Sequence, residues 1–463
     1  MYGQPALASV PAAPAGPYGL AAAKRIPWPL ALLLLTLVMP PEISVMAGPI
    51  RISPYRLVLM LWFFPCLLTL AGGRIGKVML CDVLMLAHVS WAALAMLKNH
   101  GTEHVEAAGI YGIESFGAYL MGRVYIRDAR AFRSFAAMLV LLVAVIGVFA
   151  IVELLTGRHL LREIPAKAMG RSFVSPVGTR FGLHRSYGPF DHPILYGVFA
   201  MSVLSMSWFA LARNDKLTMG RFGRTFVVGV AGCSALSSGA FATLLVQMIL
   251  IGYERFSRWL PYRWWTLVGS VAAAYIFIGA LSNRSAMHVF LSYLTFSAHT
   301  AYSRLNQWVY GMAEIRRYPL FGIGANDWVR PEWMVESIDN FWLYTTMRYG
   351  IPAFIFLAGT LAYIFWKMHR ASPMDLRRNR ALYVSTDEGR ARLAWLFTMI
   401  GIAVAAATVW LWNSVAIYFF LMIGAGVWLT RTPAPPMRRV VARPTQTAQS
   451  PLARAVGGKT EAT

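Results

Sequence analysis

Long apolar runs recur along this chain, and each has the length of about 20 residues that lets an α-helix cross a bilayer. Short polar loops separate them. The 463-residue chain is 57% hydrophobic and 14% charged, with a mean hydropathy of +0.52. A soluble protein of this length cannot bury that much apolar surface. We therefore predict an all-α, polytopic membrane protein whose membrane domain covers residues 26–430.

The apolar runs predict about twelve transmembrane helices. Their starts lie near residues 28, 57, 78, 107, 134, 193, 222, 239, 264, 340, 393 and 414. The run 222–253 has two interpretations, because Ser237 to Gly239 fit either a tight turn between two helices or a kink in one helix. A single span here would change the side of the membrane on which the later loops lie.

Lys and Arg residues indicate the orientation. With both termini in the cytoplasm every inner loop is net basic, as the positive-inside rule requires. These loops lie near residues 74–77, 123–133, 213–224, 255–263 and 367–392. Because the formal net charge of +23 is spread over short inner loops, we do not expect nucleic-acid binding. Residues 1–25 and 431–463 are rich in Ala and Pro and are predicted to be disordered cytoplasmic tails.

Two predicted outer loops, residues 156–192 and residues 283–339, are rich in arginine and break this rule. The second is the large loop between spans nine and ten. Long loops cross the membrane regardless of charge, so these arginines need no function. The alternative is that they bind an anion at the outer face, because a guanidinium grips phosphate oxygens in pairs and stays protonated. The sequence leaves both explanations open.

Four segments follow one another between residues 185 and 354. They read RSYGPFDHPILYG (185–197), SALSSGAFATLL (234–245), SRLNQWVYGMAEIRRYPLFGIGANDW (303–328) and SIDNFWLYTTMRYGIPAF (337–354). This ordered set resembles the bacterial O-antigen ligase and polymerase superfamily, the Wzy and WaaL type of integral membrane glycosyltransferase. The resemblance covers residues 180–355 or so, and the first 150 residues add only their topology.

The resemblance implies transfer of a glycan from an undecaprenyl-diphosphate carrier to an acceptor hydroxyl, at the periplasmic face of the bacterial inner membrane. It implies neither a metal nor another cofactor. Besides the lipid-linked oligosaccharide and membrane lipid, the expected partners are a flippase and a chain-length regulator. The cysteines also give no sign of a metal, because Cys66, Cys81 and Cys233 lie inside apolar runs without ligand spacing.

Departure of the diphosphate leaves negative charge on a phosphate oxygen, so fixed cations are expected beside it. Arg185 and Arg304 are the first catalytic candidates, because each lies in one of the four segments close to a predicted helix start. Arg180 and Arg284 are further candidates for binding the diphosphate. Arg171 joins them because a glycine follows it at a spacing that the resemblance associates with polymerases.

Asp339 is the candidate base for the proton of the acceptor hydroxyl. It precedes Asn340, a substrate-binding candidate, at a predicted helix start, so Asp339 has a second interpretation as a helix cap. The ligase branch has a histidine at the matching place, and the Asp-Asn pair is more similar to the polymerase branch. We therefore expect polymerisation of repeat units, with ligation to a lipid A-core acceptor as the alternative.

His192 and Trp308 are the remaining substrate-binding candidates. His192 precedes Pro193 at a span start, where proline suits a first helical turn, so a structural role is the other interpretation. The Trp308 ring suits stacking on a sugar, although aromatic residues are also common at membrane interfaces.

Acidic residues inside the predicted spans are few, and Asp82, Glu114 and Glu153 are the main ones. Asp82 and Glu153 lie near span ends, where we expect water access to accommodate the charge. Glu114 lies deeper and is expected to pair with an arginine or to line a polar cavity. Such charges also suit a different class of protein, a transporter of lipid-linked oligosaccharide. A transporter predicts two related six-span halves, and the sequence shows no internal repeat.

Overall fold

The computed structural model describes residues 26–48, 50–260, 263–281, 298–371 and 384–431, which belong to one compact unit. Regular structure in these ranges is helical apart from one hairpin, in which β1 (Val45–Ala47) pairs antiparallel with β2 (Ile50–Ile52). The predicted all-α, polytopic membrane architecture is confirmed. Arg284 and, apart from Arg431, the two predicted tails lie outside the described residues.

The helices before the first arginine-rich loop are α1 (Trp28–Leu37), α2 (Pro54–Ala71), α3 (Leu80–His100), η1 (Gly101–His104), α4 (Val105–Gly112), η2 (Ile113–Gly117), α5 (Ala118–Tyr125) and α6 (Ala129–Thr156). The loop itself contains α7 (Leu160–Ala168). The later helices are α8 (Pro193–Ser202), η3 (Met206–Ala210), α9 (Met219–Cys233), α10 (Ser238–Phe256), α11 (Arg263–Leu281), α13 (Ala298–Arg317), α14 (Phe341–Tyr349), α15 (Ile351–Ala371), α18 (Asp387–Ala406), α19 (Asn413–Gly426) and η4 (Val427–Thr430).

Eight helical segments of the described chain are long and apolar enough to cross a membrane. They are Pro54–Ala71, Leu80–Tyr125, Ala129–Thr156, Pro193–Ala210, Trp264–Leu281, Ile351–Ala371, Asp387–Ala406 and Asn413–Thr430. The segment Leu80–Tyr125 covers both predicted spans that start near residues 78 and 107. The count of twelve spans stays a prediction.

Helix ends decide one point that the sequence left open and correct the predicted span start near residue 340. The run 222–253 forms two helices, because α9 ends at Cys233 and α10 begins at Ser238. The apolar run from residue 340 is also broken, so the candidate span begins only at Ile351. Gly350 makes this break, because its φ is +84° and a Cβ there would lie 2.0 Å from the Leu320 carbonyl oxygen.

The acidic side chains inside the spans have defined partners. Glu114 pairs with Arg56 at 2.7 Å between Oε1 and Nη2, as expected from its depth. Asp82 is buried and pairs with Arg123 at 3.1 Å, and Glu153 is fully buried. The expectation that water access accommodates Asp82 and Glu153 is therefore wrong, because both residues are buried. Protein donors reach Asp82 and Glu153 Oε2, while Glu153 Oε1 has no hydrogen-bond partner among the described residues.

Helices α8 and α19 are the most buried of the candidate spans, whereas none of the α11 span is buried. The tightest crossing joins α19 to α5. A Cβ on Gly424 would lie 2.0 Å from the Tyr119 carbonyl oxygen, and a Cβ on Gly122 would lie 2.3 Å from the Leu421 carbonyl oxygen. Glycines at such crossings let helix backbones approach closely in a membrane protein.

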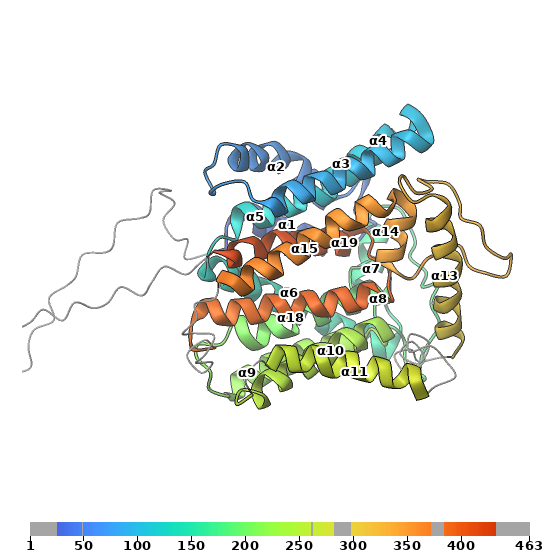
Figure 1. The fold of residues 1–463 in the computed structure, drawn as a ribbon. Helices are drawn as coiled ribbons and strands as arrows, with labels where there is room; N and C mark the ends of the chain where they lie inside the picture. The colour runs from blue at the N-terminus through green and yellow to red at the C-terminus, as the bar shows by residue number, and fades with distance from the viewer. Residues whose placement is uncertain (1–25, 49, 261–262, 282–297, 372–383, 432–463) are drawn as a thin grey trace, which may run out of the picture. The chain divides into compact units, whose positions relative to one another are not determined.

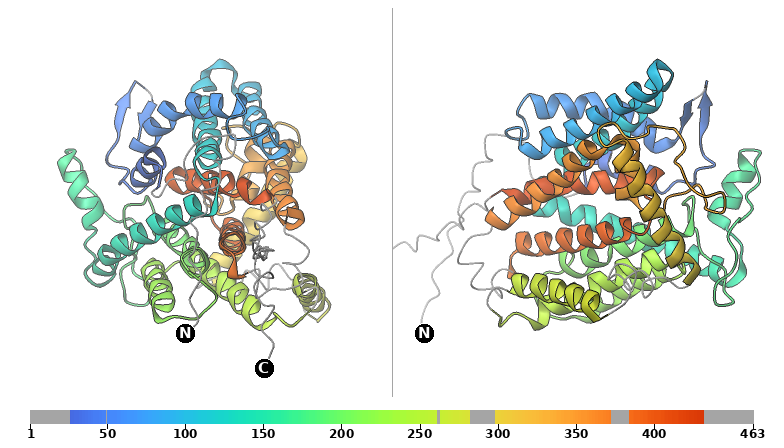
Figure 2. Two further views of the ribbon diagram at one scale, coloured as in Figure 1. Left: turned by 90° about the vertical axis from the view of Figure 1, so that its left-hand side faces the viewer. Right: turned by 45° about the vertical axis from the view of Figure 1, so that its right-hand side comes forward.

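Helix α13 runs across the ends of α10, α15 and α18 rather than along them (Figure 1). Figure 2 shows α7 and the β1–β2 hairpin at the same end of the bundle. The connection from α13 to α14 has its own small core, formed by Ile315, Ile323, Trp328, Met334, Ile338, Leu343 and Met347. We call α13 and residues 318–340 the α13 cap, because this core makes them one folded layer over the end of the helices.

We predict that Gly424→Ala destabilises the fold. The added methyl group overlaps the Tyr119 carbonyl, so α5 and α19 have to separate, and overpacking of this kind costs about 1–3 kcal/mol. The measurement is the thermal unfolding temperature of purified protein. Gly229→Ala in α9 is the matched control, because a Cβ there meets nothing within 4 Å. An equal loss of stability in both variants would contradict the close crossing.

Candidate functional site

Four helices, α8, α10, α14 and α19, begin close together. The amide of Phe341 in α14 donates to the Val409 carbonyl ahead of α19 at 3.2 Å. A Cβ on Gly239 in α10 would lie 2.5 Å from the Val409 side chain. Asn413 at the start of α19 donates to Asp191, just before α8, at 3.0 Å. Because each helix start carries a partial positive charge, their meeting favours an anion.

Arg180 and Arg185 approach these helix starts from the loop before α8. Arg180 donates to the Leu236 carbonyl oxygen at 2.6 Å, and Arg185 donates to the Ala235 carbonyl oxygen at 3.4 Å. Both acceptors lie in the turn between α9 and α10, where Leu236 has a φ of +45°. A leucine rarely adopts this backbone conformation, and such strain is commonly found at functional sites. Burial and the charge of Arg180 lower the pKa of Arg185 to about 10, so it stays protonated at neutral pH.

Arg304 reaches the same place from α13. The residue is 7% exposed, and its Nε has no hydrogen-bond partner among the described residues. Burial and the charge of Arg180 lower the pKa of its guanidinium, and the charge of Asp339 raises it. Arg304, Asp339 and Arg180 therefore lie close enough to interact electrostatically. A buried cation with an unused donor is destabilising, and an anionic ligand would relieve this.

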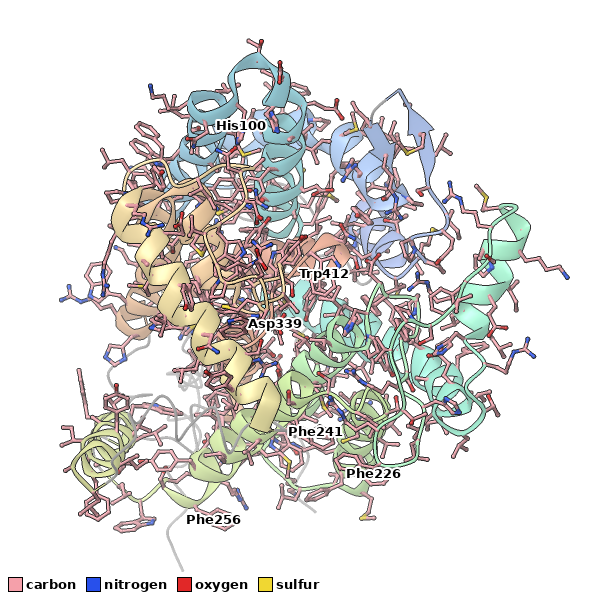
Figure 3. The ribbon with its side chains drawn as sticks, turned by 90° about the vertical axis from the view of Figure 1, so that its right-hand side faces the viewer. His100, Phe226, Phe241, Phe256, Asp339 and Trp412 are labelled. Atoms are coloured by element: carbon pink, nitrogen blue, oxygen red, sulfur yellow. The ribbon has the colours of Figure 1, made fainter. Side chains whose placement is uncertain are left out.

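Asp339 is the acidic member of the group. Burial raises the pKa of its carboxyl above the usual value, and the charge of Arg304 opposes this shift. Its backbone amide donates to Gln307 Oε1 at 2.9 Å, and Gln307 Nε2 donates to the Ser337 carbonyl at 3.0 Å. Figure 3 looks onto the end of the bundle that α13 crosses, with Asp339 near its centre and Trp412 close by in that view.

The cap of α14 is Asn340, not Asp339. The Asn340 side-chain oxygen accepts a hydrogen bond from the Leu343 amide at 3.0 Å, and the helix begins at Phe341. The interpretation of Asp339 as the helix cap is therefore wrong, because α14 begins one residue later than that interpretation requires. Its carboxylate is left for another role, while the side-chain oxygen of Asn340 is already used within the fold.

His192 has the structural role that was one of its two interpretations. Its Nδ1 accepts a hydrogen bond from the Ile194 amide at 3.2 Å and caps α8, with Pro193 at the first helical position. Burial and the charge of Arg185 lower the pKa of His192 to about 4. The ring is therefore neutral at physiological pH and is a poor candidate for holding the diphosphate by charge.

Two other sequence candidates do not join this group. Arg171 donates to the backbone carbonyl of Glu42 at 3.0 Å. Trp308 is 38% exposed on α13. Arg180, Arg185, Arg304 and Asp339 are thus the residues that the fold gathers from two loops and one helix.

The positioning roles of two residues were not predicted from the sequence. Glu153 Oε2 accepts hydrogen bonds from the amides of Tyr187 and Gly188 at 2.8 and 3.0 Å, so it holds the turn that follows Arg185. Gln307 holds the backbone of Asp339. The only available signals were the acidic side chain at the end of an apolar run and the spacing of Gln307 one turn after Arg304.

No protein-family model matches this sequence, and no curated protein matches it either. In the described part of the chain no group of three or more His, Cys, Asp and Glu residues is suited to a metal ion. Guanidinium groups, helix starts and a carboxyl with a raised pKa are together suited to binding a multiply charged anion beside a base.

We predict that Arg304→Gln raises the pKa of the Asp339 carboxyl further, because the positive charge that lowers this pKa is removed while the carboxyl stays half-buried. The measurement is an infrared titration of the aspartic carboxyl band, assigned by its loss in Asp339→Asn. Arg330→Gln is the control, since Arg330 pairs with Asp327 instead. An unchanged Asp339 titration in Arg304→Gln would show that the two groups do not interact.

Proposed function

We propose that this protein is an inner-membrane polysaccharide polymerase. It transfers an undecaprenyl-diphosphate-linked glycan to the terminal sugar hydroxyl of another lipid-linked repeat unit, with its active face in the periplasm. The observation that carries this proposal is the meeting of Arg180, Arg185 and Arg304 with Asp339 beside four helix starts. The class of substrate comes from the motif resemblance, and the side chains supply a chemistry that suits it.

The arginines act on the donor. Breaking the bond between the anomeric carbon and the phosphate oxygen leaves the electron pair on the diphosphate. Cations that are already in place stabilise this charge in the transition state without reorganisation. Arg304 has an Nε donor that no described residue uses, and Arg185 makes one long hydrogen bond of 3.4 Å to a backbone carbonyl, so both have donors to offer. Arg180 adds charge from the same loop.

Asp339 acts on the acceptor. The acceptor oxygen forms the new bond to the anomeric carbon and gives its proton to the Asp339 carboxylate, which later releases it to water. A base of this kind is most effective when its pKa lies closer to the working pH than that of an ordinary aspartate, and burial shifts Asp339 in this direction. Gln307 and Ser337 fix the backbone beside the carboxylate, so its position is defined before the substrate binds.

A repeat-unit polymerase and a ligase share this chemistry and differ in the acceptor. Asp339 followed by Asn340, in place of a histidine, favours the polymerase through the resemblance. The experiment supplies purified protein in liposomes with one lipid-linked repeat unit and no second acceptor. Polymerisation yields a ladder of longer lipid-linked chains. No ladder, with transfer only to added lipid A-core, would identify a ligase, and movement of the lipid across the bilayer without new bonds would identify a transporter.

We predict that Arg185→Ala and Arg304→Ala each reduce the rate of ladder formation by about 10²–10³-fold, because each removes a cation from the departing diphosphate. Lysine at either position should recover part of the rate, since it restores the charge but not the planar fork. The control is Arg158→Ala in the same loop, where Arg158 is exposed and pairs with Glu163. Normal ladders from both site variants would contradict the proposal.

We predict that the rate of wild-type protein falls as the pH drops through the raised pKa of Asp339, because the base has to be deprotonated. Asp339→Asn should be slow at every pH and should lose this acidic limb. The measurement is the pH profile of kcat/KM for ladder formation. A variant that keeps both the rate and the acidic limb would show that another group takes the proton.

A further inference from the structure

A row of aromatic rings begins beside the candidate site. Trp412 lies 6.0 Å from the ring of His192, Trp410 lies 5.3 Å from Trp412, and Tyr344 lies 4.6 Å from Trp410, measured between ring centroids. Tyr344 belongs to α14, and the two tryptophans belong to the connection between α18 and α19. We call Tyr344, Trp410 and Trp412 the aromatic platform. None of the three was a candidate in the sequence.

The platform is fixed to the candidate site at both ends. On one side the Val409 carbonyl accepts a hydrogen bond from the amide of Phe341, two residues after Asp339. On the other side Asn413 donates to Asp191, beside His192. Asn413 has a φ of +49°, a left-handed conformation that asparagine tolerates better than most residues. These contacts hold the tryptophans on a short, strained connection whose position is set by α8 and α14.

The rings of the platform keep accessible surface and unused donors. All three side chains are half-buried, whereas tryptophans such as Trp265 and Trp28 are 73% and 66% exposed. No described residue accepts a hydrogen bond from the indole N–H of Trp410 or Trp412, and neither nitrogen is fully buried. By contrast, the indole of Trp395 donates to the Met422 carbonyl at 2.7 Å. Arg348 lies over the Tyr344 ring at 5.2 Å, and the rings are tilted against one another, so the accessible surface is the part that these contacts leave open. The platform therefore has accessible ring surface and unused indole donors at the same place.

An interfacial aromatic belt does not account for this arrangement. Belt residues place their amphipathic rings at the level of the lipid headgroups. The platform rings instead contact one another and His192. The charge of Arg185 acts on His192, so the rings lie close to this arginine. A sugar ring has an apolar C–H face and a rim of hydroxyls, so it suits a flat aromatic surface that also carries N–H and O–H donors.

We propose that the aromatic platform binds sugar rings of the glycan next to the diphosphate. This inference rests on the proposed function, which identifies the bound anion as the diphosphate of the donor. It adds a subsite that recognises the carbohydrate. The arginines hold the charged end of the donor, and Tyr344, Trp410 and Trp412 support the sugars that follow it. The hydrogen bond from Phe341 to Val409 joins the platform to the segment that carries Asp339, so a bound chain extends past the base that serves the acceptor.

The test compares two probes bound to the full chain in lipid nanodiscs, because maltoside detergents would compete as sugars. The first probe is undecaprenyl diphosphate without sugar. The second is the lipid-linked oligosaccharide extracted from cells that produce this protein. We expect Trp410→Leu and Trp412→Leu to weaken binding of the second probe by about fivefold to tenfold each and to leave the first unchanged. Trp412→Tyr should keep most of the affinity, because a flat ring with a donor remains.

Two controls separate the platform from a general loss of fold. Trp366→Leu removes a 46% exposed tryptophan from α15 and should change binding of neither probe. Arg304→Gln should weaken both probes, because both carry the diphosphate. Thermal unfolding of each variant checks that the helices stay packed.

The possible outcomes are distinct for the two proposals. Equal weakening of both probes by the tryptophan variants, or no weakening of either, would overturn the platform. Wild-type protein that binds both probes equally tightly would also overturn it. If wild-type protein fails to bind the sugar-free diphosphate, the proposed function fails. Binding of the glycan probe that depends on Trp410 and Trp412 would support the platform even then.

Discussion

The candidate site depends on placing several positive charges where water is scarce. Arg185 and Arg304 are both less than one-tenth exposed, Arg180 adds its charge to both, and the starts of α8, α10, α14 and α19 add partial positive charge at the same place. Asp339 is the acidic residue that interacts with Arg304 there. Without an anionic ligand such a group destabilises the fold, so the surrounding contacts have to hold it together.

Those contacts come from residues that do no chemistry in the proposal. Glu153 accepts the amides of Tyr187 and Gly188 from within α6, and Leu236 accepts Arg180 while it holds a left-handed backbone conformation. Asn340 and His192 cap their helices. The hydrogen bonds of Glu153, Asn340 and His192 hold backbone amides in place. The arginines and the Asp339 carboxyl are the groups that face a ligand in the proposal.

The sequence predicts the broad architecture well, because hydropathy alone identifies helices that have to lie in lipid. It also selects Arg185, Arg304 and Asp339, since each belongs to a segment with a motif. It fails where the outcome depends on which side chain reaches which backbone group. Nothing local distinguishes Asp339 from Asn340 as the cap of α14, and nothing places Trp412 near His192, 220 residues earlier in the chain. Arg171 and Trp308 were selected by spacing and type. In the fold Arg171 donates to the Glu42 carbonyl, and Trp308 is 38% exposed.

Helix α13 gives the site one further property. It supplies Arg304, and through Gln307 it also holds the main chain at Asp339. A sideways shift of this helix would therefore carry the cation and the carboxyl together and preserve the distance between them. The distance that such a shift does change is the one between Arg304 and Arg185, which belong to separate layers. Such a shift of the α13 cap would thus alter the grip of the two arginines on the leaving group while Arg304 and Asp339 stay together.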